Sequence, residues 1–478
     1  MEVAMKITFP QEFWWGAATS GPQSEGRFHK KHDNNFDYLF DTRPELFHDG
    51  VGPNVTSNFY NSYKEDITLL KSIGLNSIRT SIQWTRLIDD FETASINEEG
   101  ARYYHDVIDA FLAQGIRPII NLNHFDMPYE LEEKYGGWLS KHVIELYAKF
   151  AEKAFELYSD KVQDWFTFNE PIVVVECGYM QQFHYPMIVD GKKAMQVAFN
   201  MQVASAKAIA AFRRVNRNQK GRIGIILNLT PSYPRDVKNP GDLEAAALAE
   251  LFTNRLFLDS SVLGFYPSEL LDLLKADGVL WQASDEEYRV IQENTVDYLG
   301  VNFYQPSRIK APDISPNVLA MDWLPHKYYD GYQMPGRRMN MDRGWEIYPQ
   351  ALYDIGMRLK EKYNNIPWYV SENGIGVSRE ERYMDSEGVV HDDYRIQFVG
   401  EHLYHLSRAI LEGSNCFGYH MWTPIDSWSW LNAYKNRYGF IRCDIRNQIK
   451  TVKKSGYWMK QIAESNVYDV PEEIIKIL

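Results

Sequence analysis

Short apolar runs alternate with longer amphipathic stretches along almost the whole chain. The short runs are rich in β-branched and aromatic residues, which is typical of buried parallel strands. We expect eight strands, near Phe13–Ala18, Leu75–Ile82, Arg117–Leu122, Asp164–Phe168, Arg222–Leu227, Asp297–Asn302, Trp368–Ser371 and Phe417–Trp422. Helical periodicity marks intervening stretches such as Tyr60–Ile73, Glu99–Gln114, His142–Tyr158, Met195–Val215, Pro349–Tyr363 and Tyr394–Leu411.

Eight strand–helix units of this kind predict an α/β fold, a (β/α)8 or TIM barrel with parallel strands. A chain of 478 residues could hold several average domains, but such barrels often exceed about 250 residues as one unit. No linker-like segment divides the sequence, so we expect one domain over residues 1–478. The Pro- and Gly-containing stretch Lys310–Gly344 is interpreted as a long loop over one mouth of the barrel.

Polar side chains stand at the ends of five predicted strands. Barrel enzymes place their working residues at the C-terminal ends of the strands. The residues found there are Arg79, His124, Asn169 with Glu170, Asn302 with Tyr304, and Glu372 with Asn373. Any one of them alone is compatible with a capping or turn role. The repetition at five strand ends predicts an active site at that end of the barrel.

The composition narrows the class of ligand. Aromatic residues make up 14% of the chain, with 13 Trp and 31 Tyr, a high content that favours a glycan ligand because aromatic faces pack against sugar C–H groups. Core packing uses the same residues, so this signal is weak alone. The formal net charge of −13 argues against a nucleic-acid partner, since there is no basic surplus to neutralise phosphates.

The N-terminal segment Met1–Pro10 lacks the apolar core of a secretory signal, and no apolar run approaches the roughly 18 residues of a membrane span. Cys177, Cys416 and Cys443 lie far apart, which indicates neither a metal site nor a disulfide scaffold. We therefore expect a cytoplasmic protein without a membrane partner. Whether it forms a homo-oligomer stays open.

Two motifs place a Glu at a predicted strand end: TFNEP (Thr167–Pro171) after the fourth strand and SENG (Ser371–Gly374) after the seventh. They resemble the acid/base and nucleophile motifs of glycoside hydrolase family 1, a retaining (β/α)8 family. Other segments follow in that family's order: FWWGAATSGPQSEG (Phe13–Gly26), SIRTSIQWTR (Ser77–Arg86), NHFDMP (Asn123–Pro128), EKYGGWLS (Glu133–Ser140), GVNFY (Gly300–Tyr304), RGWEIYP (Arg343–Pro349), GYHMWTPIDSWSW (Gly418–Trp430) and RYGF (Arg437–Phe440). The resemblance covers nearly the whole chain.

A retaining glycosidase needs a carboxylate that attacks the anomeric carbon and a carboxylic acid that protonates the leaving oxygen, about 5–5.5 Å apart. The resemblance assigns the first role to Glu372 and the second to Glu170. It further implies that Arg79 and Tyr304 hold the charge of Glu372. Asn169 is expected to bind the sugar 2-hydroxyl, and Asn302 to contact the sugar or support the site. No metal or organic cofactor is implied.

The same resemblance implies the residues that bind the sugar ring. Gln23, His124 and Trp422 are expected at the cleavage subsite, with Trp430 beside them. Trp345 is either a core residue or a platform for the aglycone, and the sequence does not separate the two. Phe125 replaces a Trp of many relatives, which keeps an aromatic surface but loses an indole donor.

Ser429 stands where ordinary β-glucosidases of the family carry a Glu that binds the sugar 4- and 6-hydroxyls. A carboxylate there would repel a 6-phosphate, because two like unit charges about 4 Å apart cost about 4 kcal/mol at an effective dielectric constant of about 20. A hydroxyl donates to phosphate instead. Family members that cleave 6-phosphoglycosides combine such a Ser with a Lys and a Tyr, and Tyr438 matches that Tyr. The expected substrate is therefore a 6-phospho-β-glucoside.

The Lys of that pattern is not matched directly, because Asn436 occupies its position and Lys435 precedes it. Either Lys435 reaches the phosphate, or Asn436 donates in its place, or the substrate is not phosphorylated. Trp430 is typical of phospho-β-galactosidases, so a 6-phospho-β-galactosidase and an unphosphorylated β-glucosidase stay open as alternatives. A catalytically silent, glycan-binding barrel is disfavoured because both carboxyls are present.

Overall fold

The computed structural model describes residues 5–217, 220–313, 323 and 325–477, and its centre is a closed barrel of eight parallel strands. In chain order these are β2 (Trp14–Ala18), β3 (Ser77–Ser81), β6 (Arg117–Asn121), β7 (Asp164–Asn169), β8 (Arg222–Asn228), β10 (Tyr298–Asn302), β15 (Trp368–Asn373) and β16 (Cys416–Trp422). The barrel closes where β16 pairs with β2. The predicted (β/α)8 barrel and all eight of its strands are confirmed.

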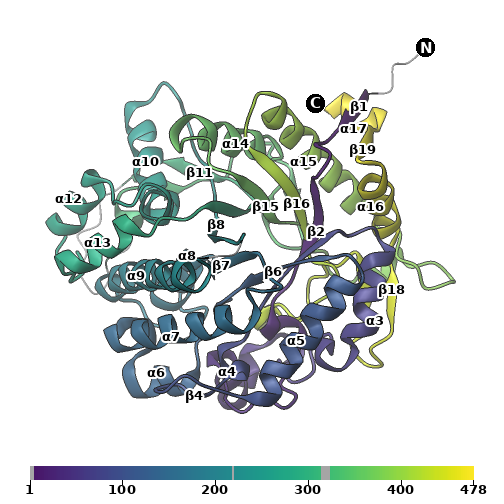
Figure 1. Ribbon diagram of the computed structural model, residues 1–478. Helices are drawn as coiled ribbons and strands as arrows, with labels where there is room; N and C mark the ends of the chain where they lie inside the picture. Colours follow the sequence, from purple (N-terminus) through teal and green to yellow (C-terminus); the bar gives the residue numbers. More distant parts are fainter. Residues whose placement is uncertain (1–4, 218–219, 314–322, 324, 478) are drawn as a thin grey trace.

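Helices surround the barrel and cover its outer face (Figure 1). At least one helix follows each strand: α3 (Phe59–Ser72), α5 (Glu98–Ala113), α7 (Lys141–Tyr158), α9 (Gly191–Val215), α11 (Leu256–Val262), α14 (Gln350–Lys362), α15 (Asp393–Leu411) and α16 (Lys454–Ser465). The six helices expected from the sequence are among them. The segment between β8 and β10 also forms α10 (Pro240–Glu250), α12 (Ser268–Ala276) and α13 (Asp285–Glu293). These were not predicted, and in α10 alanines on several faces blur the apolar stripe that marks a helix.

An aromatic cluster fills the barrel interior towards the N-terminal ends of the strands. Trp14 and Tyr369 pack with ring centroids 5.4 Å apart, and Phe166 and Tyr298 with centroids 4.7 Å apart. The guanidinium of Arg222 lies 5.1 Å from the Trp14 ring and 4.5 Å from the Tyr298 ring. Because these side chains close one end of the barrel, a substrate has access only at the C-terminal ends of the strands.

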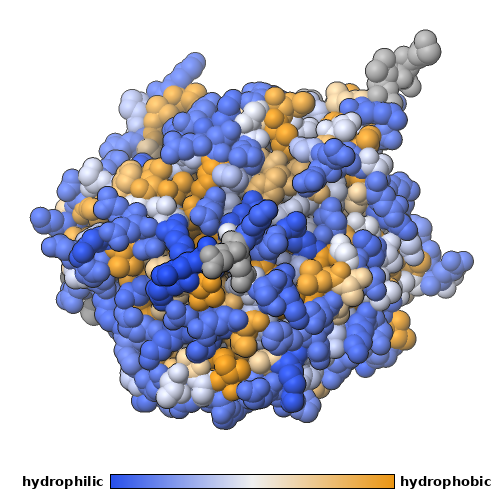
Figure 2. Space-filling model, viewed as in Figure 1, coloured by the Kyte–Doolittle hydropathy of each residue, from blue (hydrophilic) through white to orange (hydrophobic). Residues whose placement is uncertain are grey.

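The two ends of the described chain lie side by side (Figure 1). Strand β1 (Met5–Thr8) pairs antiparallel with β19 (Val467–Val470), so that Met5 faces Val470, and α17 (Glu472–Ile477) follows. The surface in Figure 2 is mostly hydrophilic, with small hydrophobic areas scattered over it. Among the described helices, none combines the length and the apolar content that crossing a membrane would require.

The interpretation of Lys310–Gly344 as an irregular loop is partly wrong. Strand β11 (Ser307–Lys310) forms a small sheet with β9 (Ser232–Pro234) and β12 (Asp330–Gly331), and β13 (Met339–Asn340) pairs with β14 (Trp345–Glu346). Strands of two residues leave no alternating pattern in a sequence, because a strand's period needs several residues to appear. Residues 314–322 and 324 lie outside the described part of the chain.

Candidate active site

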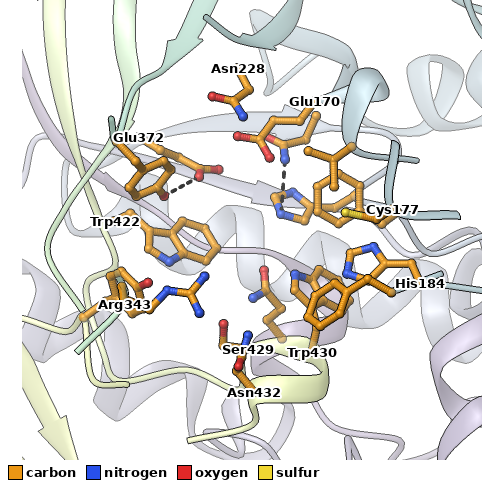
Figure 3. Close-up of a pocket in the computed structure, with 18 of the residues that line it drawn as sticks. Glu170, Cys177, His184, Asn228, Arg343, Glu372, Trp422, Ser429, Trp430 and Asn432 are labelled. Atoms are coloured by element: carbon orange, nitrogen blue, oxygen red, sulfur yellow. Dashed lines mark hydrogen bonds between the residues drawn. The ribbon is translucent and has the colours of Figure 1, made fainter. Parts of the chain in front are cut away.

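A cavity of ≈ 250 Å³ opens at the C-terminal ends of the barrel strands. The side chains of Glu170 and Glu372 point into it from two sides, and Ser429 and Asn432 lie at its other end (Figure 3). Strands β7 and β15, which carry the two glutamates, are separated by β8 and β10 in the barrel. Their ends therefore stand across the mouth of the barrel from each other.

Glu170 is positioned by an unusual backbone conformation. It follows β7 and directly precedes α8 (Pro171–Tyr179), with φ 45° and ψ 60° in the left-handed region. The following Pro171 contributes, since a residue before proline is disfavoured in the right-handed helical region. Left-handed backbone is uncommon for a residue other than glycine and concentrates at functional sites. The side chain that results is 8% exposed.

Glu372 is the penultimate residue of β15 and is held from two sides. The guanidinium of Arg79, from β3, donates to its Oε1. The hydroxyl of Tyr304 donates to its Oε2 over 2.7 Å. Arg79 is fully buried and also donates to the Thr19 carbonyl over 3.0 Å, which fixes the guanidinium plane. Both groups stand where the resemblance places them.

Asn302, the last residue of β10, holds the carboxyl group of Glu170. Its amide nitrogen donates to Glu170 Oε1 over 2.8 Å and to Asn169 Oδ1 over 3.1 Å. Asn302 also opposes the rise in the pKa of Glu372, so its amide lies near both carboxyl groups. A retaining mechanism needs the two carboxyls about 5–5.5 Å apart, and both line the same pocket.

The two carboxyls have different electrostatic surroundings. Burial and, next to it, the neighbouring charge of Glu372 raise the pKa of Glu170 to about 8, while Asn302 and Arg79 oppose the rise. Burial also raises the pKa of Glu372, but Arg79 and Tyr304 oppose that rise by direct contact. The pair therefore favours a proton on Glu170 and a negative charge on Glu372.

The side chains expected at the sugar ring also line the pocket. His124 accepts a hydrogen bond from Arg79 at its Nδ1 over 3.1 Å, and its Nε2 lies 3.4 Å from the Asn169 amide nitrogen. Burial and the charge of Arg79 hold the His124 pKa well below its usual value, so the ring is neutral. Gln23 lies on α1 (Gly21–Ser24) and donates to the Trp428 carbonyl over 2.9 Å. The rings of His124 and Trp422 are nearly parallel, 6.0 Å apart.

Residues 5–468 match the sequence profile described as Glycosyl hydrolase family 1. The chain belongs to this family. It is 51% identical over 459 residues to the 6-phospho-beta-glucosidase GmuD of Bacillus subtilis, covering 95% of this chain and 97% of that protein. A 6-phospho-beta-galactosidase of Staphylococcus aureus is 33% identical over 96% of this chain and 99% of its own. The family 1 β-glucosidase of Thermotoga maritima superposes with a TM-score of 0.87 at 29% identity, covering 97% and 99% of the two chains.

The family 1 pocket is also lined by residues of β14 and of the segment after β16. Ser429 precedes the short helix η8 (Trp430–Asn432) and is half-buried, whereas Trp430 and Tyr438 are buried. Trp430 packs on Phe36 with ring centroids 4.2 Å apart. Trp345, on β14, lines the pocket and packs on Tyr304, with centroids 5.3 Å apart. Trp345 therefore lines the pocket, and its role as a platform for the aglycone stays a prediction.

The structure does not bring Lys435 or Asn436 to the pocket. Lys435 is exposed and is not among the lining residues. Asn436 is buried, and its amide nitrogen donates to the backbone carbonyl of Asp342 over 3.3 Å, so this donor is already used within the protein. The expectation that one of them lines a phosphate site is corrected on this geometry. The loop exposes Lys435 to solvent and buries Asn436, and neither side chain lines the pocket.

Several lining residues were missed by the sequence reasoning. They are Val173, Cys177, Phe183, His184, Asn228, Thr230, Gln305, Arg343 and Asn432. Asn228 ends strand β8, so the rule that polar residues follow barrel strands could have found it. His184 lies in the loop after α8, and no motif or strand end in the sequence pointed to it. Burial lowers its pKa to about 3, and neither of its ring nitrogens has a hydrogen-bond partner. Among the described side chains, no three His, Cys, Asp or Glu residues are grouped as metal ligands.

Proposed function

We propose that this family 1 glycosidase hydrolyses 6-phospho-β-D-glucosides to glucose 6-phosphate and an aglycone, with retention at the anomeric carbon. The observation that carries the proposal is the division of the pocket: Glu170 and Glu372 lie at one end, and Ser429 lies at the other (Figure 3). Of the described lining residues, only the two glutamates carry a carboxyl group. A dianionic phosphate near Ser429 would therefore meet no negative charge. The named activity of the Bacillus subtilis relative supports the same substrate.

In the first step, ionised Glu372 attacks the anomeric carbon while protonated Glu170 donates its proton to the leaving oxygen. The C–O bond to the aglycone breaks, and a covalent glycosyl ester of Glu372 forms. The contacts of Arg79 and Tyr304 keep the attacking carboxylate charged and oriented before the reaction. Because these contacts exist without substrate, little reorganisation is needed when charge develops.

In the second step, Glu170 acts as a base and removes a proton from a water molecule that attacks the same carbon. Esterification removes the charge of Glu372, and with it a repulsion that had raised the pKa of Glu170. The pKa of Glu170 therefore falls, so its carboxyl group is ionised and free to accept a proton at the stage that needs a base. We propose that Asn169, which accepts a hydrogen bond from Asn302, binds the sugar 2-hydroxyl, where contacts strengthen in the transition state.

A comparison of three p-nitrophenyl glycosides tests the substrate. We expect a higher kcat/KM for the β-glucoside 6-phosphate than for the unphosphorylated β-glucoside, by at least about 100-fold, because two or more hydrogen bonds to a charged phosphate are lost without it. The 6-phospho-β-galactoside is the third substrate, because Trp430 and the Staphylococcus aureus relative favour that activity as a second candidate. Faster turnover of the unphosphorylated glucoside would contradict the proposal.

The pH dependence follows from the pKa of Glu170. A raised pKa keeps the acid protonated at neutral pH, so activity is present below about 8 and is lost as the pH rises through that value. We expect kcat/KM for a 6-phosphorylated disaccharide to fall on the alkaline side with a midpoint near 8. Phosphate ionisation, with a pKa of about 6, does not interfere in this range.

A matched variant tests whether the loss of activity at alkaline pH comes from Glu170 or from another carboxyl group with a raised pKa. Burial also raises the pKa of Glu132 to about 8, and Glu132 lies outside the pocket. Glu132→Gln should keep the alkaline limb, whereas Glu170→Gln should lose it together with most of the activity on this substrate. An unchanged limb in Glu170→Gln would assign the titration to another group.

A further inference from the structure

We propose that Arg343 binds the substrate's 6-phosphate and takes the place of the Lys that the corresponding position, now Asn436, no longer provides. This inference rests on the proposed function and names the group that gives it specificity. Arg343 lines the pocket, and its guanidinium extends towards the end where Ser429 and Asn432 lie (Figure 3). Among the described lining residues it is the one with a cationic side chain.

Arg343 is presented by a short hairpin. It lies in the turn between β13 and β14, where the backbone nitrogens of Arg343 and Gly344 both donate to the Asn340 carbonyl, over 3.3 and 2.8 Å. Gly344 has φ +72°, a conformation that glycine adopts without strain. The Asn340 side chain donates to the Gly376 carbonyl over 3.0 Å, which anchors the turn to the segment after β15. The position of Arg343 is thus set by backbone contacts.

Asn436 forms part of the same support. Its amide nitrogen donates to the carbonyl of Asp342, the residue directly before Arg343. The phosphoglycosidases that this chain resembles have a Lys at this position. Here the position is Asn436, which holds the turn that contains Arg343. Asn436 thus lacks the positive charge of a Lys at its own position, but it helps to hold the turn that carries the positive charge of Arg343. Lys435, exposed outside the pocket, takes no part in it.

The charge of Arg343 is not neutralised within the described structure. No described carboxylate oxygen lies within 4.0 Å of its guanidinium, and its buried Nε has no hydrogen-bond partner. The neighbouring carboxylate of Asp342 is bound instead by Ser378 and by Arg382, the latter at 3.4 Å. A half-buried guanidinium without a counter-ion is a site for an anionic ligand, because the ligand supplies the missing charge.

The surrounding groups fit a phosphate. The guanidinium carbon lies 4.2 Å from the centre of the Trp345 ring, which fixes the plane of the fork. The charge of Arg343 also opposes the rise that burial causes in the pKa of Tyr438, so the two side chains lie near each other. The Ser429 hydroxyl and the Asn432 amide add neutral donors at the same end. Arginine binds phosphate through two parallel N–H···O bonds, which a point charge such as Lys cannot do. The site therefore binds a dianionic phosphate at the sugar 6-position much more strongly than a neutral 6-hydroxyl.

The test compares Arg343→Gln, Arg343→Lys and, as the matched control, Lys435→Gln on p-nitrophenyl β-glucoside 6-phosphate and on the unphosphorylated glucoside. We expect Arg343→Gln to lose about 10- to 100-fold in kcat/KM on the phosphorylated substrate, mainly through a higher KM. On the neutral substrate it should stay within about threefold of wild type. Arg343→Lys should recover part of the loss, because it restores charge without the fork. Lys435→Gln should match wild type on both substrates.

Inhibition by glucose 6-phosphate and by glucose provides a readout that does not depend on turnover. Arg343→Gln should raise the Ki of glucose 6-phosphate by a similar factor and leave that of glucose unchanged, with near-UV circular dichroism checking the fold. Equal losses with both substrates, no loss with either, or loss of phosphate preference in Lys435→Gln would each overturn the assignment. A wild type that prefers the unphosphorylated glucoside would instead refute the proposed function itself.

Discussion

Glu372→Ala is expected to abolish hydrolysis, with a loss on the order of 10⁴-fold or more, because the covalent step has no other nucleophile in the pocket. Of the described lining residues, Glu170 is the only other one with a carboxyl group, and its surroundings favour protonation. The vacated space next to Arg79 and Tyr304 should accept a small anion. Added azide should therefore attack the anomeric carbon from the face that Glu372 occupied.

The product of this rescue identifies the nucleophile. Attack by azide without a covalent enzyme intermediate inverts the anomeric carbon once, so the product is the α-glycosyl azide. Its configuration is read from the anomeric proton by NMR, with an activated aryl 6-phosphoglucoside as substrate. Glu132→Gln, another buried carboxyl removed outside the pocket, serves as the control and should retain activity without azide. A β-azide, or full activity of Glu372→Ala, would mean that the nucleophile is a different residue.

Glu170→Gln is expected to lower kcat/KM about 10³-fold for substrates with poor leaving groups, because a glutamine amide cannot donate the proton that the leaving oxygen needs. An aryl leaving group with a low pKa departs without that proton, so the first step should be affected much less. Glutamine keeps the size of the side chain and can still meet the Asn302 amide, so the pocket should keep its shape.

A series of aryl 6-phosphoglucosides with increasing leaving-group pKa measures this effect. The slope of log(kcat/KM) against leaving-group pKa should be steeper in Glu170→Gln than in wild type. Asn302→Ala is a useful comparison, because it removes the hydrogen bond to Glu170 but leaves the proton donor in place. Equal slopes in wild type and Glu170→Gln would argue against the acid role of Glu170.

Much of the fold was predictable from the sequence, since each barrel strand is buried on both faces and appears as an apolar run. The run from Arg222 to Leu227, for example, is strand β8 with its end one residue further. The helices that were missed lie between β8 and β10, where small residues weaken the periodic pattern. The pairing of β1 with β19 joins residues from the two ends of the chain, and a local pattern contains no information about such a contact.

The candidate site was likewise predictable only in part. Glu170, Glu372, Arg79 and Tyr304 were predictable because motif and strand end coincide, and a barrel brings strand ends together whatever the loops do. Ser429 and Tyr438 were also predicted from the resemblance, and both line the pocket, but Arg343 was missed because it lies in a turn between two very short strands. Whether Lys435 or Arg343 faces the pocket depends on how two turns pack against each other.

The sequence by itself determined the barrel, the family resemblance and the two carboxyls with their nearest supports, because these follow from residue type and from strand order. Only the tertiary structure decided which cation lies beside Ser429. The amide of Asn436 binds the carbonyl before Arg343, and this contact spans 94 residues of chain. A hydrogen bond between distant loops has no signature in either segment alone, so the choice between two cations is made by packing.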